Sequence, residues 1–188
     1  MVTQIIGITA MKGVGKSTLA SLLAELIPGA EIVAFADALR GEAFEMLNGW
    51  LYTTGAEKYV TLDWLEEHKG TVWGAVLQGF GEFRRQWNGQ DYWVKRLSEW
   101  AQDHDVMIIP DVRYPNEVDF VKSNGGLLVA IYGPSRWEND TRSTAHPSET
   151  SVSACQALAD IAVHNEGDLS ELRLWAELIV KELAHRGK

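Results

Sequence analysis

The sequence predicts an α/β fold built on a parallel sheet, and three observations support this. Short, continuous apolar runs rich in β-branched residues recur along the chain, as is typical of strands buried on both faces. Helical patterns lie between these runs, and strands that alternate with helices favour parallel pairing with right-handed crossovers. A glycine-rich stretch follows the first run and opens the first helix. The expected strands cover residues 4–9, 31–36, 105–110, 127–132 and 160–164, and the expected helices cover residues 16–27, 37–48, 72–87, 91–103, 115–123, 149–158 and 168–186.

The local residues justify these elements in order. The first strand contains Ile5-Ile6-Gly7-Ile8, and the helix after it has leucines at 19, 22, 23 and 26 on one face. The later strands contain the runs at 32–35, 106–109, 127–131 and 161–163. The last helix carries apolar residues at helical spacing, and Asp168 followed by Glu171 predicts its N-terminal cap. Residues 49–70 and 133–148 lack a core pattern, so we expect them to serve as lids or binding loops.

Composition limits the classes of function. A chain of 188 residues, 46% of them apolar, suits one domain or one domain with an inserted lobe. Its net charge of −9 argues against non-specific binding to nucleic acid or to a membrane surface. The lone cysteine, Cys155, excludes an internal disulfide and a multi-cysteine zinc site, and we expect a reduced, buried thiol. No leader and no apolar run of membrane length is apparent, which favours a cytoplasmic protein.

The glycine-rich stretch from Ala10 to Thr18 is the most informative feature. It matches the phosphate-binding P-loop pattern G-x-x-x-x-G-K-[ST], except that Ala10 replaces the first glycine. Glycines let backbone N–H groups converge on phosphates, and the following helix points its positive end at the anion. We expect Lys16 to reach the outer phosphates of ATP and Ser17 to hold Mg²⁺. The expected ATP-binding residues of this loop are Gly13, Val14, Gly15, Lys16, Ser17 and Thr18.

A second candidate element ends the third expected strand. Asp111 follows the apolar run that begins at Val106, as in a Walker B element, where the carboxylate holds Mg²⁺ through water or orients the phosphate acceptor. The alternative is a helix cap or turn residue. Arg113 is a fork-shaped donor suited to phosphate, and its alternative is a structural salt bridge with Glu117.

Two further groups are candidates for an acceptor site. Asp37 and Arg40 follow the second strand and could face the acceptor substrate, although Asp37 could instead cap its own helix. Adjacent arginines on a helix cannot both face one point, so we expect one of Arg84 and Arg85 to reach the site, unless both lie on a solvated face. Gln78 could read a nucleobase edge or lie on the helix surface.

The polar loop at 133–148 carries Arg136 and Arg142. Phosphoryl transfer spreads negative charge that cations must match, so we expect both arginines to act in catalysis, the alternative being a solvated loop. His146 is interpreted as a structural or phosphate-side hydrogen-bond donor, because histidines are too few here to favour a metal site. Most of the eight tryptophans are expected in the core.

Several short motifs together resemble a known family. They are Phe35-Ala-Asp37, Leu77-Gln78, Asp91-Tyr-Trp-Val94, Asp111-Val-Arg-Tyr-Pro-Asn-Glu117, His146-Pro-Ser-Glu149 and Asp160-Ile-Ala-Val-His-Asn165-Glu-Gly167. In order and spacing they resemble the phage-type deoxynucleoside monophosphate kinases, relatives of adenylate kinase. The resemblance covers most of the chain except about 49–70. Ala10 departs from the P-loop pattern, and Gly81-Glu82 replaces an expected Gly-Thr pair.

The resemblance implies a P-loop NTPase three-layer fold in a single domain, 1–188. This fold has a five-stranded parallel sheet, a nucleoside-monophosphate-binding insert at about 37–90 and a lid at about 133–148. It also implies transfer of the γ-phosphoryl group of ATP to a deoxynucleoside 5′-monophosphate, with Mg²⁺ at Ser17 and Asp111. Asn165 would border the adenine of ATP, and the location would be the host cytoplasm if the protein is viral. The implied monophosphate-site residues are Asp37, Arg40, Gln78, Arg84 and Arg85, and the implied catalytic residues are Lys16, Asp111, Arg113, Arg136 and Arg142.

Two other functions stay open at this point. A P-loop kinase of another small acceptor would share these motifs, and the 49–70 segment would decide between them. A regulator that binds ATP without transferring phosphate is slightly favoured by Ala10 and disfavoured by the arginine-bearing loop. A GTPase is not expected, because the sequence has no Asn-Lys-x-Asp element. The accepted base, the need for deoxyribose and the assembly state, with a homodimer as one option, are not predicted.

Overall fold

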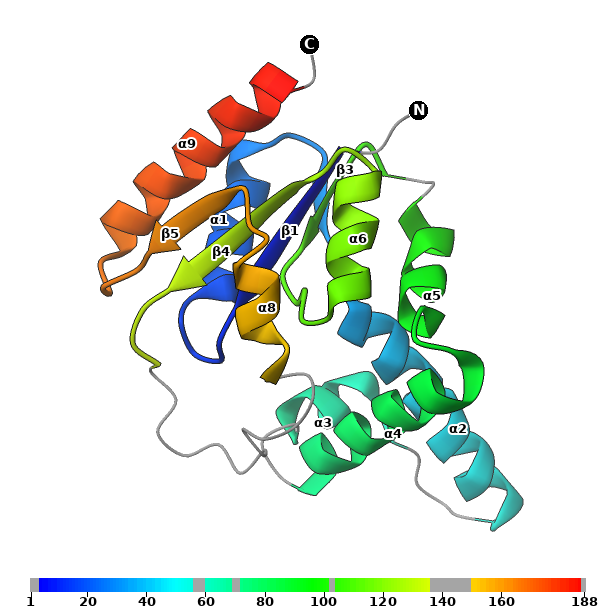
Figure 1. The fold of residues 1–188 in the computed structure, drawn as a ribbon. Helices are drawn as coiled ribbons and strands as arrows, with labels where there is room; N and C mark the ends of the chain where they lie inside the picture. The colour runs from blue at the N-terminus through cyan, green and yellow to red at the C-terminus, as the bar shows by residue number, and fades with distance from the viewer. Residues whose placement is uncertain (1–3, 56–59, 69–71, 102–103, 136–149, 187–188) are drawn as a thin grey trace.

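A computed structural model describes residues 4–55, 60–68, 72–101, 104–135 and 150–186. Its centre is a five-stranded parallel sheet with the strand order β2-β3-β1-β4-β5 (Figure 1). The predicted α/β class and the parallel five-stranded sheet are confirmed. The strands are β1 (Gln4–Ala10), β2 (Ala30–Ile32), β3 (Val106–Ile109), β4 (Leu127–Tyr132) and β5 (Ile161–His164).

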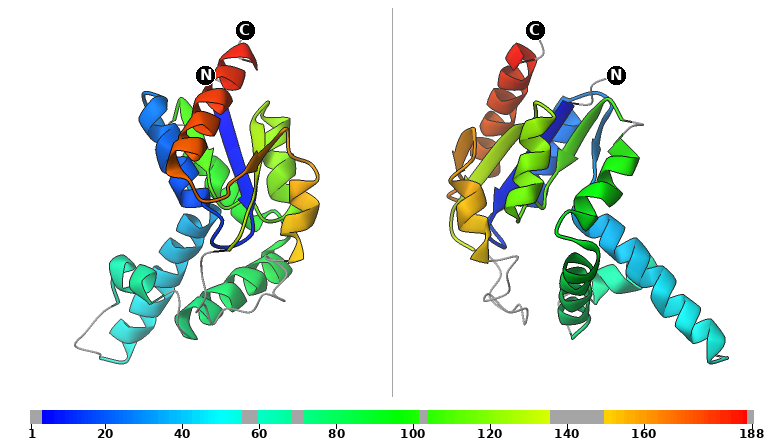
Figure 2. Two further views of the ribbon diagram at one scale, coloured as in Figure 1. Left: turned by 90° about the vertical axis from the view of Figure 1, so that its left-hand side faces the viewer. Right: turned by 45° about the vertical axis from the view of Figure 1, so that its right-hand side comes forward.

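Helices cover both faces of the sheet and complete three layers. Helices α1 (Lys16–Leu26) and α9 (Leu169–Arg186) pack on one face, while α5 (Tyr92–Ala101), α6 (Pro115–Ser123) and α8 (Val152–Gln156) lie on the other (Figure 2). Side chains of β1 alternate between the two cores: Ile6 and Ile8 face α1 and α9, and Ile5 faces the opposite layer. All three are almost fully buried, which explains why the strand reads as a continuous apolar run.

A helical lobe projects beyond the carboxyl edge of the sheet. It consists of α2 (Phe35–Thr53), α3 (Leu62–Glu67) and α4 (Val72–Asn88) (Figures 1 and 2). The stretch at 49–70 was expected to be irregular, but its described residues include the end of α2 and all of α3. Helix α2 is therefore longer than expected and carries the chain away from the sheet before α4 returns toward it.

The second strand and the second helix differ from expectation. The run at 31–36 predicted a strand, but β2 ends at Ile32 and α2 begins at Phe35. The first N–H groups of α2 are bound by carboxylates of Asp37 and Asp111, as described below, and this capping favours an early helix start. The predicted helix at 149–158 is also shorter, since α8 spans only Val152–Gln156.

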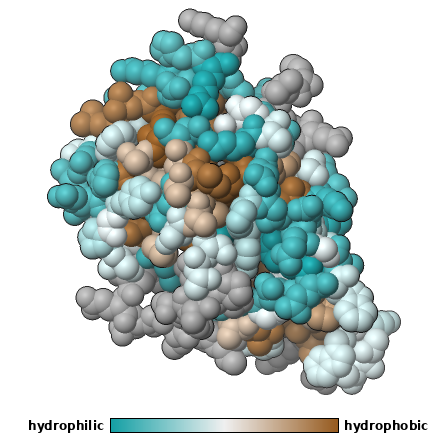
Figure 3. Space-filling view, in the orientation of Figure 1, coloured by the Kyte–Doolittle hydropathy of each residue, from teal (hydrophilic) through white to brown (hydrophobic). Residues whose placement is uncertain are grey.

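Four smaller features complete the description of the fold. The predicted cap of α9 is present, because Asp168 accepts a hydrogen bond from the N–H of Ser170 at 2.8 Å. Cys155 is buried, as expected, and burial raises the pKa of its thiol to about 11. Figure 3 shows apolar side chains gathered toward the β5 and α9 side of an otherwise mostly hydrophilic face, where Leu174 and Leu178 are half exposed or more. Across the described residues, every helix is too short or too polar to cross a bilayer.

Candidate active site

A cavity of about 610 Å³ opens at the carboxyl edge of the sheet, where the sequence analysis placed the chemistry. Five segments form its wall: the P-loop, the start of α2, one face of α4, Trp93 of α5, and the loop between β3 and α6 together with the first turn of α6. The α4 residues recur every three or four positions and so share one helical face. The lining residues are Lys12, Gly13, Gly15, Lys16, Ser17, Thr18, Ala34, Phe35, Ala36, Leu39, Arg40, Gly74, Leu77, Gln78, Gly81, Glu82, Arg85, Trp93, Pro110, Asp111, Arg113, Tyr114 and Glu117.

The P-loop has the backbone that its glycines predict. Gly13 and Gly15 have φ angles of 79° and 103°, in the left-handed region that favours glycine, and α1 begins directly after them. Ala10 is the last residue of β1 and pairs with Ile131 of β4, and no non-glycine residue described in the structure has a positive φ. Alanine therefore fits where the pattern has its first glycine. Lys16 Nζ donates hydrogen bonds to the carbonyls of Ala10 and Met11 at 2.9 and 2.8 Å, so its ammonium is held against the loop.

Asn165 braces the P-loop from the end of β5. Its side chain is buried, its Nδ2 donates to the Val14 carbonyl at 2.9 Å, and its Oδ1 accepts from the N–H of Gly167 at 3.1 Å. A Cβ on Gly15 would lie 2.5 Å from this Nδ2, so the loop has no room for a larger residue there. Asn165 does not line the cavity described above. Its side chain holds the loop, and its expected position beside adenine stays a prediction.

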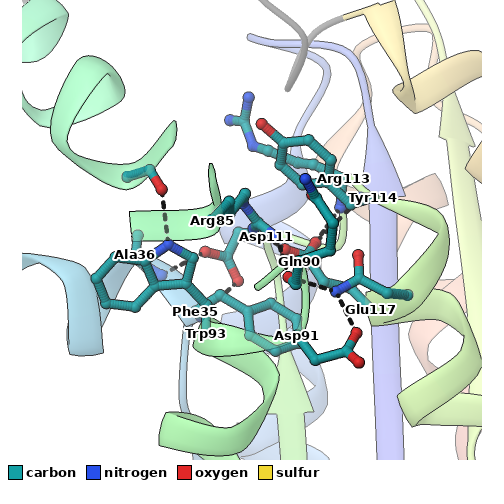
Figure 4. Close-up of polar contacts among 12 residues, drawn as sticks. Phe35, Ala36, Arg85, Gln90, Asp91, Trp93, Asp111, Arg113, Tyr114 and Glu117 are labelled. Carbon is teal, nitrogen blue, oxygen red and sulfur yellow. Dashed lines mark hydrogen bonds and ion pairs between the residues drawn. The ribbon is translucent and has the colours of Figure 1, made fainter. Parts of the chain in front are cut away.

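Two aspartates cap the N-terminus of α2. Asp111 accepts hydrogen bonds from the N–H groups of Phe35 and Ala36 at 3.0 and 2.9 Å (Figure 4). Asp37 accepts from the N–H of Ala34 at 2.7 Å and pairs with Arg40. Both aspartates therefore cap a helix, which was the alternative to a functional role for each. Asp37 caps its own helix, and Asp111 caps α2 through Ala36, 75 residues away in the chain. Burial raises the pKa of Asp111, and the Ala36 N–H and the Arg113 charge oppose that rise.

The two adjacent arginines of α4 diverge, as expected. Arg85 is 5% exposed, lines the cavity and pairs with Glu117 at 2.6 Å. Arg84 is not among the lining residues; it pairs with Glu42, and its guanidinium lies over the ring of Phe80. Gln78 and Arg40 also line the cavity, whereas Asp37 does not. The structure therefore gathers Arg40, Gln78 and Arg85 on one wall and leaves Arg84 outside it.

The sequence analysis did not predict the contacts that Glu117 makes. It was considered only as an ion-pair partner for Arg113, but its carboxylate pairs with Arg85 and accepts the main-chain N–H of Arg113 at 2.7 Å. Burial raises the pKa of Glu117 to about 7, against the opposing charge of Arg85. Its spacing of three residues from Tyr114, across Pro115, is a capping-box signal that could have indicated a role in fixing this loop.

Close packing between α2, α4 and α5 shapes the far wall of the cavity. Trp93 is 1% exposed and donates its Nε1–H to the Gly81 carbonyl at 3.1 Å, so it has the expected core position. The expectation of a core position for most tryptophans is wrong for Trp50 and Trp87, which are 64% and 78% exposed on the projecting helical lobe. A Cβ on Gly81 would lie 2.6 Å from Leu39 Cδ1, so a larger residue there would force the Leu39 side chain to move where α4 packs against α2. Sequence reasoning did not identify Leu39 or Trp93 as site residues.

Part of the predicted site lies beyond the described residues. Arg136, Arg142, His146 and Glu149 fall in this group, so their expected roles stay predictions. Among the side chains that the structure describes, no three His, Cys, Asp or Glu residues are grouped so that they could hold a metal ion.

Comparisons with known proteins show which family this chain resembles. Residues 84–174, just under half of the chain, match the family model of deoxynucleotide monophosphate kinase. The resemblance to that family is confirmed. A protein of Acanthamoeba polyphaga mimivirus, provisionally named a deoxynucleotide monophosphate kinase, is 28% identical over 183 residues, covering 86% of this chain and 89% of that protein. The deoxynucleotide monophosphate kinase of Enterobacteria phage T4 is 29% identical over 86 residues, covering 43% of this chain and 33% of the phage protein.

A solved structure extends the match to the whole fold. The dephospho-CoA kinase from Campylobacter jejuni aligns with a TM-score of 0.55 and 14% sequence identity, covering 97% of this chain and 98% of that one. Identity at this level shows a shared fold and says nothing of a shared substrate. Together with the family match, it identifies the chain as a kinase of the P-loop class.

Proposed function

We propose that the protein transfers the γ-phosphoryl group of ATP to a deoxynucleoside 5′-monophosphate, giving a deoxynucleoside diphosphate and ADP. One observation carries the proposal: the P-loop and a wall bearing arginines from three segments share a single cavity. Its volume of about 610 Å³ falls in the usual range of about 300–1,000 Å³ for ligand pockets. The family match and the viral relatives support this choice of acceptor.

The charge of the cavity suits two polyanionic substrates. Its lining includes the cationic side chains of Lys12, Lys16, Arg40, Arg85 and Arg113 in a chain whose net charge is −9. Two of its three carboxylates are committed, since Asp111 binds two backbone N–H groups and Glu117 pairs with Arg85, and the third belongs to Glu82. A local excess of positive charge on an acidic protein favours a specific anion-binding site over non-specific electrostatic binding.

We assign the P-loop to the triphosphate. Its glycine backbone and the start of α1 present N–H groups to anions, and Lys16 lies at the same wall. We assign Arg113, in the loop between β3 and α6, to stabilising charge on the transferring group, because its side chain lines the cavity. Arg40, Gln78 and Arg85 form the acceptor wall in this proposal. Catalysis would consist of positioning and charge stabilisation, without a covalent enzyme intermediate.

The described residues fit a phosphate-bound Mg²⁺. Ser17 and Asp111 both line the cavity, and Mg²⁺ commonly takes one or two protein oxygens together with water and substrate phosphates. Both oxygens of Asp111 already accept an N–H, so we assign Asp111 to binding through water and Ser17 to direct ligation. The ion would neutralise charge on the phosphates. Arg136 and Arg142 are proposed to add further cations.

The proposal is tested by incubating the purified protein with ATP, Mg²⁺ and each deoxynucleoside monophosphate and measuring the diphosphate formed. We expect product with at least one monophosphate and near-complete loss of turnover in Lys16→Ala and Arg113→Ala. Arg96→Ala, an exposed cation of α5 that pairs with Glu99, is the matched control and should keep full activity. Transfer to another small acceptor but to no deoxynucleoside monophosphate, or tight ATP binding with no transfer at all, would contradict the proposal.

A further inference from the structure

A single buried carboxylate connects two walls of the cavity. Glu117 is 1% exposed and lies in the first turn of α6. Its Oε1 accepts from Arg85 Nη2 at 2.6 Å, and its Oε2 accepts from the N–H groups of Arg113 and Tyr114 at 2.7 and 3.1 Å (Figure 4). A glutamate at this helix position usually caps its own helix at the surface. Here the same carboxylate also reaches α4, a helix of the projecting lobe.

The arginine at the other end of this contact is equally constrained. The Arg85 guanidinium lies 3.8 Å from the centre of the Tyr114 ring and donates to the Gln90 carbonyl at 3.1 Å. Asn116 of α6 donates to the same carbonyl at 2.9 Å. The end of α4 and the loop between β3 and α6 are therefore fastened together by side chains from both sides.

We propose that Glu117 is a positioning residue for phosphoryl transfer. Through one carboxylate it holds the main chain of Arg113 and the guanidinium of Arg85, and so it sets the spacing between the transfer-side arginine and the acceptor wall. An apolar pair can replace many buried ion pairs, but no apolar side chain could also bind the two N–H groups. The inference rests on the proposed function, because Arg113 and the acceptor wall take their roles from it.

A double-mutant cycle between Glu117 and Arg113 tests the inference. Glu117→Gln keeps the size of the side chain but removes its charge, and we expect kcat to fall about ten- to a hundredfold because small misplacements of reacting groups cost that much. The KM for ATP should stay within twofold. In an Arg113→Lys background, which keeps a cation at this position, Glu117→Gln should lower kcat at least threefold less than it does in the wild type, because part of its effect acts through Arg113. Effects that simply multiply would overturn the inference. Glu99→Gln, on the exposed side of α5, is the matched control.

Two further measurements separate positioning from plain stability. Backbone hydrogen exchange at Arg113 and Tyr114 should accelerate at least tenfold in Glu117→Leu, which removes the oxygen that accepts both N–H groups, and unchanged exchange would overturn the inference. Hydrogen exchange is measured without substrate. A wild-type protein with no kinase activity would therefore contradict the proposed function, but the contact between Glu117 and the Arg113 main chain could still be tested. The double variant Arg85→Met with Glu117→Leu replaces the ion pair by apolar side chains. We expect it to fold with kcat at least tenfold below that of Arg85→Met alone, and a kcat equal to that of Arg85→Met would mean that Glu117 acts only as the partner of Arg85.

Discussion

Replacing Gly15 by alanine tests whether the P-loop requires its observed backbone. Gly15 has a φ of 103°, and an added Cβ would lie 2.5 Å from Asn165 Nδ2. Gly29, between α1 and β2, offers a matched control with a φ of 77° and no atom within 4 Å of an added Cβ. Both substitutions force alanine into the left-handed region, but only Gly15→Ala collides with another residue.

The expected cost can be worked from these contacts. A left-handed conformation costs an ordinary residue about 1–2 kcal/mol, which applies to both variants. Gly15→Ala also displaces the Asn165 amide from the buried Val14 carbonyl, and an unsatisfied buried acceptor costs about 1–3 kcal/mol. The free energy of unfolding should therefore fall by about 1–2 kcal/mol in Gly29→Ala and by about 2–5 kcal/mol in Gly15→Ala.

Urea denaturation measures the free energy of unfolding. Isothermal titration calorimetry measures the affinity for ATP, which depends on the backbone conformation of the P-loop. We expect Gly29→Ala to bind ATP as the wild type does. Gly15→Ala should bind at least tenfold more weakly, because the backbone that faces the phosphates moves. Equal destabilisation of the two variants, or ATP affinity within twofold of wild type in Gly15→Ala, would refute this account of the loop.

Three other predictions follow from the described contacts. Asp111→Asn leaves one α2 N–H without an acceptor and should lower the free energy of unfolding by about 1–3 kcal/mol in urea titrations; unchanged stability would mean that the carboxylate does not cap α2. For Asp160, burial raises the pKa, but the Leu128 N–H and Lys122 lower it more, so the folded pKa lies below the unfolded one. Its stabilisation is then present above the unfolded pKa and lost as pH falls through the folded pKa. The stability gap between wild type and Asp160→Asn, followed by urea titrations across pH, should thus shrink on acidification, and a constant gap would contradict the assignment. The Cys155 thiol, whose pKa burial raises to about 11, should react far more slowly with a thiol reagent at pH 8 in the native protein than in urea, and equal rates would count against its burial.

Local patterns predicted the parts of the site that lie close together in the chain. The P-loop was predictable because glycines at 13 and 15 require positive φ and stand between an apolar strand and an amphipathic helix. The position of Asp111 at the cavity was predictable because strands of a parallel sheet end at one edge. The divergence of Arg84 and Arg85 followed from the angle between neighbouring positions on a helix.

Long-range contacts account for what the sequence did not predict. Asn165 binds a carbonyl 151 residues away, and Glu117 pairs with an arginine 32 residues away, so no local spacing signals either role. The early start of α2 depends on the Asp111 carboxylate from the loop after β3, which overrides the strand preference of the run at 31–36. Helix α3 escaped prediction because it is only six residues long.

Binding of a bisubstrate analogue would test the central claim most directly. Adenosine and a deoxynucleoside joined through five phosphates would span the P-loop and the arginine wall only if both line one continuous site. Since linking two ligands raises the effective concentration of the second, we expect one molecule per chain to bind at least a hundredfold more tightly than ATP, with that gain lost in Arg113→Ala. An analogue that binds no more tightly than ATP itself would contradict a cavity shared by donor and acceptor.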